Sequence, residues 1–117
     1  MADEKVETVQ SITSGTIGRA KNEVRGVSVA FDSSSRPQPD ALTNSEAFLG
    51  SVSSCGVTLI EMHAQETGVK LDGMAVTIEG TRTAAAPNRF ARVAMTFELE
   101  GITQREAEAL VETYRGR

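Results

Sequence analysis

The sequence has only one cysteine, one histidine and one tyrosine, and no tryptophan, among its 117 residues. A single cysteine excludes an internal disulfide framework and a zinc site built from several cysteines, and it fits a reducing compartment. No apolar run approaches the roughly 18 residues that a membrane-spanning helix needs. The polar, acidic start of the chain is not typical of a secretory signal. We therefore expect a cytoplasmic protein with no membrane partner.

The chain also lacks a concentration of basic residues. Its 12 lysines and arginines are scattered and are outnumbered by 16 acidic residues, which give a net charge of -4. This pattern predicts no nucleic-acid partner. Glu61, His63 and Glu66 lack the same-face pairing of a zinc-protease helix, and the glycines have no dinucleotide-binding spacing. We expect no metal and no cofactor, and the length predicts a single domain over residues 1–117.

The most informative stretch is 43–67, which the pattern predicts to be one long helix. Apolar residues recur there at steps of four and three residues, which is a helical stripe. The stripe consists of Phe48, Val52, Cys55, Leu59 and Met62. Thr43 and Glu46 have the spacing of a capping box, and Gly68 follows the last periodic residue as a natural stop. Leu49 and Ile60 widen the stripe, so we expect the helix to be mostly buried.

Small residues dominate the middle of this helix, from Gly50 to Gly56. Each of the two glycines costs about 1 kcal/mol relative to alanine inside a helix. We expect the close approach of another backbone to offset that cost.

The rest of the chain indicates short strands and one further helix. The expected strands are 6–13, 27–31, 74–83 and 91–100, and the expected terminal helix is 104–114. Between the first two strands lies a glycine-rich segment that we interpret as a turn region, and 33–42 has the composition of a mobile loop. The order predicts an α+β domain with antiparallel strands around a long central helix. These elements cover the helix incompletely, which favours obligate association.

Cys55 is the residue with the most distinctive chemistry. One interpretation is a thiolate that attacks a small electrophile such as a peroxide, which needs a nearby cation and access. The alternative is a small hydrophobic residue in the core. The helix dipole is strong only in the first turn, and Cys55 lies beyond that turn. A cation that stabilises its thiolate must therefore come from another segment. The candidates are Arg19, Arg25 and Arg36.

Two other polar residues of the helix have separate interpretations. His63 is about 12 Å along the axis from Cys55, so the two do not form a nucleophile–base pair. We expect His63 at the surface or at an interface. Glu46 is first a capping residue, and it has a second possible role in holding a catalytic arginine through a carboxylate–guanidinium pair.

The stretch SEAFLGSVSSCGVTLIEMHAQETGVKLDGMAVTIEG resembles the osmotically inducible protein C / organic hydroperoxide resistance superfamily. The shared pattern is an acid at a helix start, a run of small residues ending in cysteine, a glycine, a V-x-L run and a β-hairpin. The later segment GITQREAEALVETY is similar to the opening of the family's last helix. The resemblance covers about residues 25–115. The spacing of Glu46 and Cys55 matches the general OsmC-like branch, whereas the hydroperoxide-resistance branch usually has its acid one residue earlier, where this chain has Ser45.

The resemblance implies an OsmC-like intertwined α+β homodimer, with two central helices packed back to back and sheets wrapped around them. It implies a thiol-dependent peroxidase that reduces organic hydroperoxides and hydrogen peroxide in defence against oxidative stress. Cys55 is then the peroxidatic cysteine, Arg25 or Arg19 is the cation, and Glu46 orients that arginine. A small-molecule hydroperoxide and an external thiol reductant are the implied partners.

Two departures from the family pattern bear on this interpretation. Enzymatic members have a resolving cysteine in a Cys-Pro turn after the last helix, where this sequence reads VETYRGR. Either the sequence is a partial form or this member has no resolving cysteine. The family motif also has a proline where Ser45 stands. The alternatives are a non-catalytic OsmC-like dimer that binds a small apolar ligand, and a structural relic in which Cys55 is inert.

Overall fold

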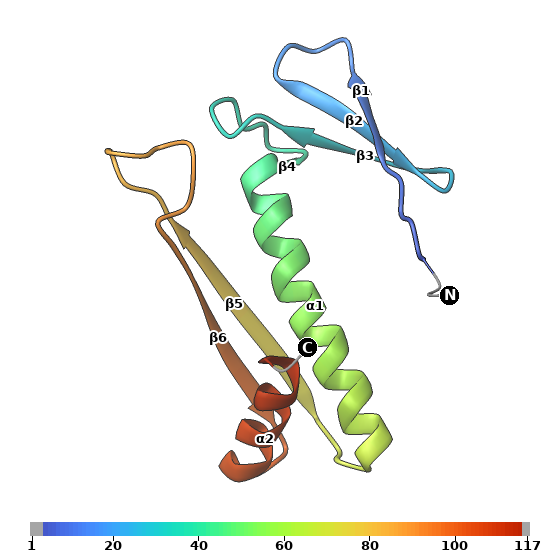
Figure 1. Ribbon diagram of the computed structural model, residues 1–117, viewed down its shortest axis with the longest axis vertical. Coiled ribbons are helices and arrows are strands. Elements are labelled where there is room, and N and C mark those ends of the chain that lie inside the picture. Colours follow the sequence, from blue (N-terminus) through green and yellow to red (C-terminus); the bar gives the residue numbers. More distant parts are fainter. Residues whose placement is uncertain (1–3, 116–117) are drawn as a thin grey trace. The chain divides into compact units, whose positions relative to one another are not determined.

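The computed structural model describes residues 4–115 and divides the chain into two compact units, one up to Phe48 and one from Leu49 (Figure 1). Each unit has its own sheet. In chain order the elements are β1 (Gln10–Thr13), β2 (Arg19–Val24), β3 (Val27–Asp32), β4 (Leu42–Thr43), α1 (Asn44–Thr67), β5 (Gly73–Thr81), β6 (Arg92–Glu100) and α2 (Gln104–Arg115). The expected α+β class is confirmed.

The sheet of the first unit has the strand order β1-β2-β3-β4. The first three strands pair antiparallel, and β4 runs parallel to β3. The interpretation of the segment between the first two expected strands as a turn region was wrong, because β2 lies there and pairs with both β1 and β3. Its sequence, RAKNEV, has little apolar alternation, so pairing on both sides rather than side-chain pattern makes it a strand. The expected strand over 6–13 keeps only its last four residues as β1.

A two-residue turn joins β2 to β3. Arg25 and Gly26 occupy it with φ angles of 50° and 80°. Two successive positive φ values are the signature of a type I′ turn, whose twist matches that of the flanking strands. Arg25 is therefore an exposed residue at the tip of a hairpin.

The expected start and end of the long helix are confirmed. The backbone N–H of Thr43 donates to Oε1 of Glu46 at 2.9 Å, and the N–H of Glu46 donates to Oγ1 of Thr43 at 3.2 Å. This reciprocal pair is a capping box and satisfies two donors at the start of α1. At the other end Gly68 has a φ of 75°, and the N–H of Val69 donates to the carbonyl of Ala64 at 2.9 Å. Glycine at that position ends the helix without steric cost.

The core of the second unit lies where the C-terminal half of α1 meets α2. Ile60, Ala64 and Leu110 are 1%, 2% and 3% exposed. Around them pack Val69, Leu71, Met74, Phe97, Leu99, Ile102, Val111 and Tyr114. The β5–β6 hairpin is confirmed in full register from Gly73 opposite Glu100 to Thr81 opposite Arg92. A second capping box, between Thr103 and Glu106, starts α2 as expected.

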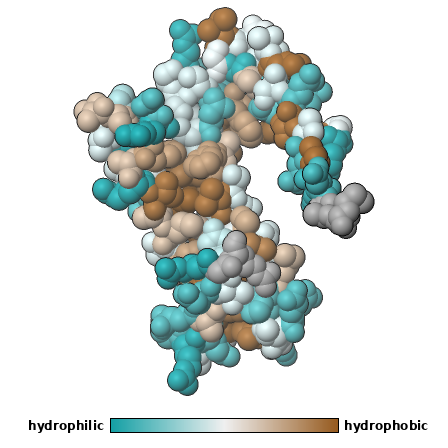
Figure 2. Space-filling model, in the orientation of Figure 1, coloured by the Kyte–Doolittle hydropathy of each residue, from teal (hydrophilic) through white to brown (hydrophobic). Residues whose placement is uncertain are grey.

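The face of α1 that the chain buries differs from the expected stripe. Gly56, Ile60 and Ala64 are buried at successive four-residue steps, whereas Cys55 is exposed and Met62 is 50% exposed. Apolar side chains accordingly reach the surface (Figure 2). The helix has small and apolar residues on several of its faces, so the periodicity of the sequence alone does not select the buried one. The structure of this chain therefore does not show a helix that is buried all round.

Gly56 shows what the run of small residues accommodates within the chain. A Cβ atom at this position would lie 3.5 Å from the side chains of Met95, Phe97 and Tyr114. Within the chain the neighbours of Gly56 are thus side chains of β6 and α2, and the approach of another backbone at this run of small residues stays a prediction. At Gly50 a Cβ atom would meet nothing within 4 Å.

This packing predicts opposite effects for two substitutions of Gly56. Gly56→Leu should lower the free energy of unfolding by about 1–3 kcal/mol, because the longer side chain overpacks the site. Gly56→Ala should be tolerated, because its methyl group makes an ordinary contact and alanine favours the helix by about 1 kcal/mol. Urea unfolding of the full chain measures both, with Gly50→Ala as the control in open space. A Gly56→Leu protein as stable as the parent would contradict the packing.

Candidate functional site

Cys55 lies on α1 in the second unit, and its thiol is free and exposed. The segment that carries it is held from α2. The hydroxyl of Tyr114 donates to the carbonyl of Val52 at 3.5 Å, and the ring of Tyr114 lies over Gly56. The ring of Phe97 supports it at a centroid distance of 5.7 Å. The backbone on both sides of Cys55 is therefore fixed, while the thiol itself has access to solvent.

Glu46 lies at the start of α1 in the first unit and is exposed. Its Oε1 accepts the N–H of Thr43 in the capping box. Among the described residues, the carboxylates that bind Arg19 are Asp32 and Asp40, not Glu46. The capping role is thus observed, and the role of holding an arginine stays a prediction.

Arg19 is the centre of an ion cluster in the first unit. Its Nε and Nη2 donate to the two oxygens of Asp32 at 2.6 and 3.1 Å. Its Nη2 and Nη1 donate to the two oxygens of Asp40 at 2.6 and 3.2 Å. The hydrogen bond to Asp32, followed in size of effect by that to Asp40, raises the pKa of Arg19. The same bonds lower the pKa of both carboxyl groups. Arg19 is therefore a permanently charged and oriented guanidinium.

Asp32 and Asp40 were not identified from the sequence. Arg19 stands directly opposite Asp32 in the β2–β3 register, so the pair follows from strand pairing. With β2 interpreted as a turn region, that register was not available. The sequence signal for Asp32 is its place at the end of a β-favouring run. Because loops commonly contain aspartate, this signal does not distinguish an ion-pair partner from a loop residue.

The other two candidate arginines have different surroundings. Arg25 occupies the exposed tip of the β2–β3 turn. Arg36 lies on the loop after β3, and its side chain packs over Gly18, where a Cβ atom would meet its Cδ at 3.0 Å. Within residues 4–115, Arg19 is the one of these three arginines that carboxylates hold in position.

His63 lies near Glu66 on α1, and its separation from Cys55 in function stays a prediction. Its side chain is 26% exposed, and its Nδ1 lies 3.9 Å from Oε2 of Glu66, beyond hydrogen-bond distance. Residues 4–115 include no group of three His, Cys, Asp or Glu side chains that could hold a metal ion. Neither helix in that range is long and apolar enough to cross a membrane.

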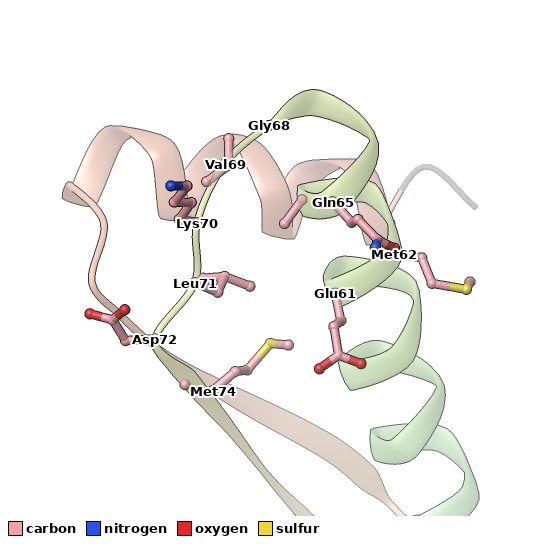
Figure 3. A pocket seen from close by; sticks show the side chains of 11 residues that line it. Glu61, Met62, Gln65, Gly68, Val69, Lys70, Leu71, Asp72 and Met74 are labelled. Atoms are coloured by element: carbon pink, nitrogen blue, oxygen red, sulfur yellow. The ribbon is translucent and has the colours of Figure 1, made fainter.

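A groove of about 870 Å³ lies in the second unit at the C-terminal end of α1 (Figure 3). Leu71 and Met74 point into it, Glu61 faces them from the helix, and Met62 points away. The volume is in the range of small-molecule sites, with an apolar floor and a few polar groups at the rim. The groove is an arrangement that the sequence did not predict, since its residues come from the helix end and the connection to β5.

The comparisons with known proteins define the class of this chain. A family model described as OsmC-like protein matches residues 37–117, which is more than half of the chain. The chain therefore belongs to the OsmC-like protein family. No curated protein matches it.

Solved structures agree with this assignment at the level of the fold. An OsmC-like protein from Mycoplasma pneumoniae matches with a TM-score of 0.81 and 11% identity, over 98% of this chain and 84% of its own. An organic hydroperoxide resistance protein from Legionella pneumophila matches with a TM-score of 0.71 and 20% identity, over 98% and 85%. The organic hydroperoxide resistance protein OhrB of Bacillus subtilis matches with a TM-score of 0.59 and 15% identity, over 96% of this chain and 84% of its own. Identities this low establish the fold alone.

The ion cluster predicts a specific dependence of stability on acid. The pKa values of Asp32 and Asp40 lie below the usual 3.8 because Arg19 binds both carboxylates. A carboxyl whose pKa is lower in the folded state stabilises the fold above its unfolded pKa, and this contribution is lost as the pH falls through its folded pKa. We expect the free energy of unfolding to fall below about pH 4. The Asp32→Asn, Asp40→Asn double variant should be less stable at neutral pH and less sensitive to acid.

Urea unfolding across the acid range measures this difference. Glu23→Gln is the control, since Glu23 belongs to the same sheet but lies near Lys21, at 3.7 Å. Identical acid profiles for the parent and the double variant would contradict the assignment.

Proposed function

We propose that this OsmC-like protein reduces organic hydroperoxides and hydrogen peroxide through Cys55, as part of the defence against oxidative stress. The observation that carries the proposal is an exposed free thiol on a helix backbone fixed by Tyr114, within the segment that the family model matches. Some neighbours of the same fold are named organic hydroperoxide resistance proteins, which supports this chemistry. We place the activity in the cytoplasm, where thiol reductants are available.

The proposed reaction proceeds in two steps. The Cys55 thiolate attacks one peroxide oxygen, so that an S–O bond forms, the O–O bond breaks, and the alcohol leaves after taking a proton. Cys55 becomes a sulfenic acid. An external thiol then attacks its sulfur and releases water, and a second thiol frees Cys55 by forming an external disulfide. Two thiols are oxidised for each hydroperoxide reduced.

We assign the cationic role in this reaction to Arg19. A guanidinium stabilises both the thiolate and the charge that develops on the leaving oxygen. The buried pair with Asp32 orients Arg19, and a reacting thiolate takes the place of the exposed Asp40 at the other edge, whereas Arg25 occupies a turn tip. Glu46 keeps its proposed role as a residue that positions the arginine in the reacting state, next to its capping role.

We also propose that the protein acts as a homodimer. The motivation is the apolar surface of α1 that the chain itself leaves uncovered, where Met62 is 50% exposed. Burial of such a face against a second copy removes apolar area from water. Sedimentation equilibrium at micromolar concentration tests this, and a stable folded monomer would refute it.

A second candidate function is the non-catalytic binding of a small apolar ligand. The groove between the end of α1 and the start of β5 favours it, because Leu71 and Met74 form an apolar floor there. The two functions differ in their dependence on Cys55, which does not line this groove.

The peroxidase proposal predicts a single-cysteine reaction. With excess organic hydroperoxide and no added thiol, Cys55 should form a sulfenic acid that dimedone traps, or continue to sulfinic acid. Steady turnover should require an added small thiol. Cys55→Ser should abolish hydroperoxide consumption while leaving the urea midpoint close to that of the parent, because the thiol is exposed. Mass spectrometry of the intact chain and a peroxide-consumption assay provide the measurements.

Two results would refute this chemistry. One is a Cys55→Ser protein that consumes hydroperoxide as fast as the parent. The other is a parent chain whose mass gains no oxygen or dimedone adduct at Cys55 under excess hydroperoxide.

The assignment of the cation predicts a difference between two arginines. Arg19→Ala should slow the first step by about 10²-fold or more, in line with the loss of one oriented charge-stabilising group. Arg25→Ala should change the rate little, since that side chain lies at an exposed turn. Single-turnover oxidation, followed by dimedone trapping, measures the step directly. If Arg25→Ala is the slower variant and Arg19→Ala reacts like the parent, the assignment is reversed.

A further inference from the structure

The guanidinium of Arg19 has two edges, and a different carboxylate binds each. The first edge, Nε and Nη2, binds Asp32, and the second edge, Nη1 and Nη2, binds Asp40. Each carboxylate uses both oxygens, which is the fork-to-fork geometry that arginine forms with planar oxyanions. The second edge is therefore a formed binding site for a carboxylate, and the chain itself supplies the present occupant.

The two occupants are held very differently. The side chain of Asp32 is 1% exposed, stands opposite Arg19 in the sheet register, and also accepts the N–H of Gln38 at 3.2 Å. The side chain of Asp40 is 70% exposed and belongs to the loop between β3 and β4. Asp32 is thus a fixed partner, whereas Asp40 can leave without uncovering a buried group.

The charge balance of the cluster also favours the departure of Asp40. One carboxylate is enough to neutralise Arg19, so the second gives the cluster a net charge of -1. The negative charge of Asp40 acts against the ionised form of Asp32. Because the side chain of Asp40 is 70% exposed, water and salt compete for it, and the pair with Asp40 is readily exchanged. A further charged side chain near the start of β2 is Arg36, which packs over Gly18 and adds positive charge.

We infer that the outer edge of Arg19 is a subsite for a small carboxylate, and that Asp40 closes it from the loop in the absence of that ligand. The loop supports exchange, since residues 34–40 are all exposed. The buried pair with Asp32 keeps the guanidinium in place when Asp40 leaves. The subsite lies within the first unit, so its existence does not depend on the reaction proposed for Cys55.

Acetate is the probe that tests this subsite, and the ¹⁵N and ¹H shifts of the Arg19 Nε–Hε group are the signal. In the parent, Asp40 competes with acetate for the outer edge of Arg19. The apparent Kd for acetate is the intrinsic Kd divided by the fraction of molecules in which Asp40 has left that edge. Asp40→Ala removes the competitor, so we expect acetate to bind about tenfold more tightly to this variant than to the parent. Asp40→Asn should also bind acetate more tightly than the parent does, and it replaces the alanine variant in the experiment if that variant fails to fold.

The controls separate specific binding from general effects of charge. Sodium chloride at the same ionic strength should not reproduce the shift, and Glu23→Gln should bind acetate like the parent, because Glu23 belongs to the same sheet but pairs with Lys21. Arg19→Lys should lose the tighter binding even in the Asp40→Ala background, as followed by backbone amide shifts of β2. The inference is overturned if acetate leaves the Arg19 signal of the folded Asp40 variants unmoved. Chloride that shifts this signal equally, or an unchanged affinity after removal of Asp40, would overturn it as well. Loss of peroxidase activity at Cys55 would leave this result unaffected.

Discussion

The second unit depends on the contact of one face of α1 with β6 and α2. Gly56, Ile60 and Ala64 form that face, and the absence of a side chain at Gly56 lets the rings of Phe97 and Tyr114 approach the helix. Because a helix turns 100° per residue, the burial of Gly56 directs its neighbour Cys55 away from this contact. The exposure of the thiol is thus a consequence of core packing and not of a separate feature of the surface.

In the first unit the corresponding constraint is electrostatic. Its sheet buries little apolar area, and Val27 and Val29 remain 54% and 48% exposed. The ion pair of Arg19 with Asp32 joins two adjacent strands at the position where the chain leaves β3. A fully buried carboxylate without a partner would be strongly unfavourable, so this pair specifies the β2–β3 register as well as stabilising it. The two units therefore use different interactions to fix their geometry.

The sequence predicted those parts of the fold that depend on local signals. Both capping boxes, the glycine that ends α1 and the alternation along β5 and β6 were read correctly, because each is encoded within a few residues. The missed strand β2 has no such signal, since its neighbours in space make it a strand. The face of α1 that the chain itself buries was not identified, because small residues on several faces are equally compatible with packing. Among the candidate functional residues, Cys55 and Arg19 were named from residue chemistry. The partners of Arg19 within its own unit, Asp32 and Asp40, were missed because the pair with Asp32 depends on a strand register that only the folded sheet reveals.

The two-residue parallel strand β4 has a consequence for how this chain can vary. It pairs Phe31 with Leu42 and Asp32 with Thr43, so the loop leaves and re-enters the sheet at adjacent backbone positions. The last ladder residue of β3 and the capping residue of α1 are thereby fixed to each other, whatever lies between them. Doubling the length of such a closed loop costs only about 0.6 kcal/mol in closure entropy. Insertions between residues 33 and 37 therefore need not move either the buried carboxylate or the start of the helix, whereas Gln38 and Asp40 contact the ion cluster directly.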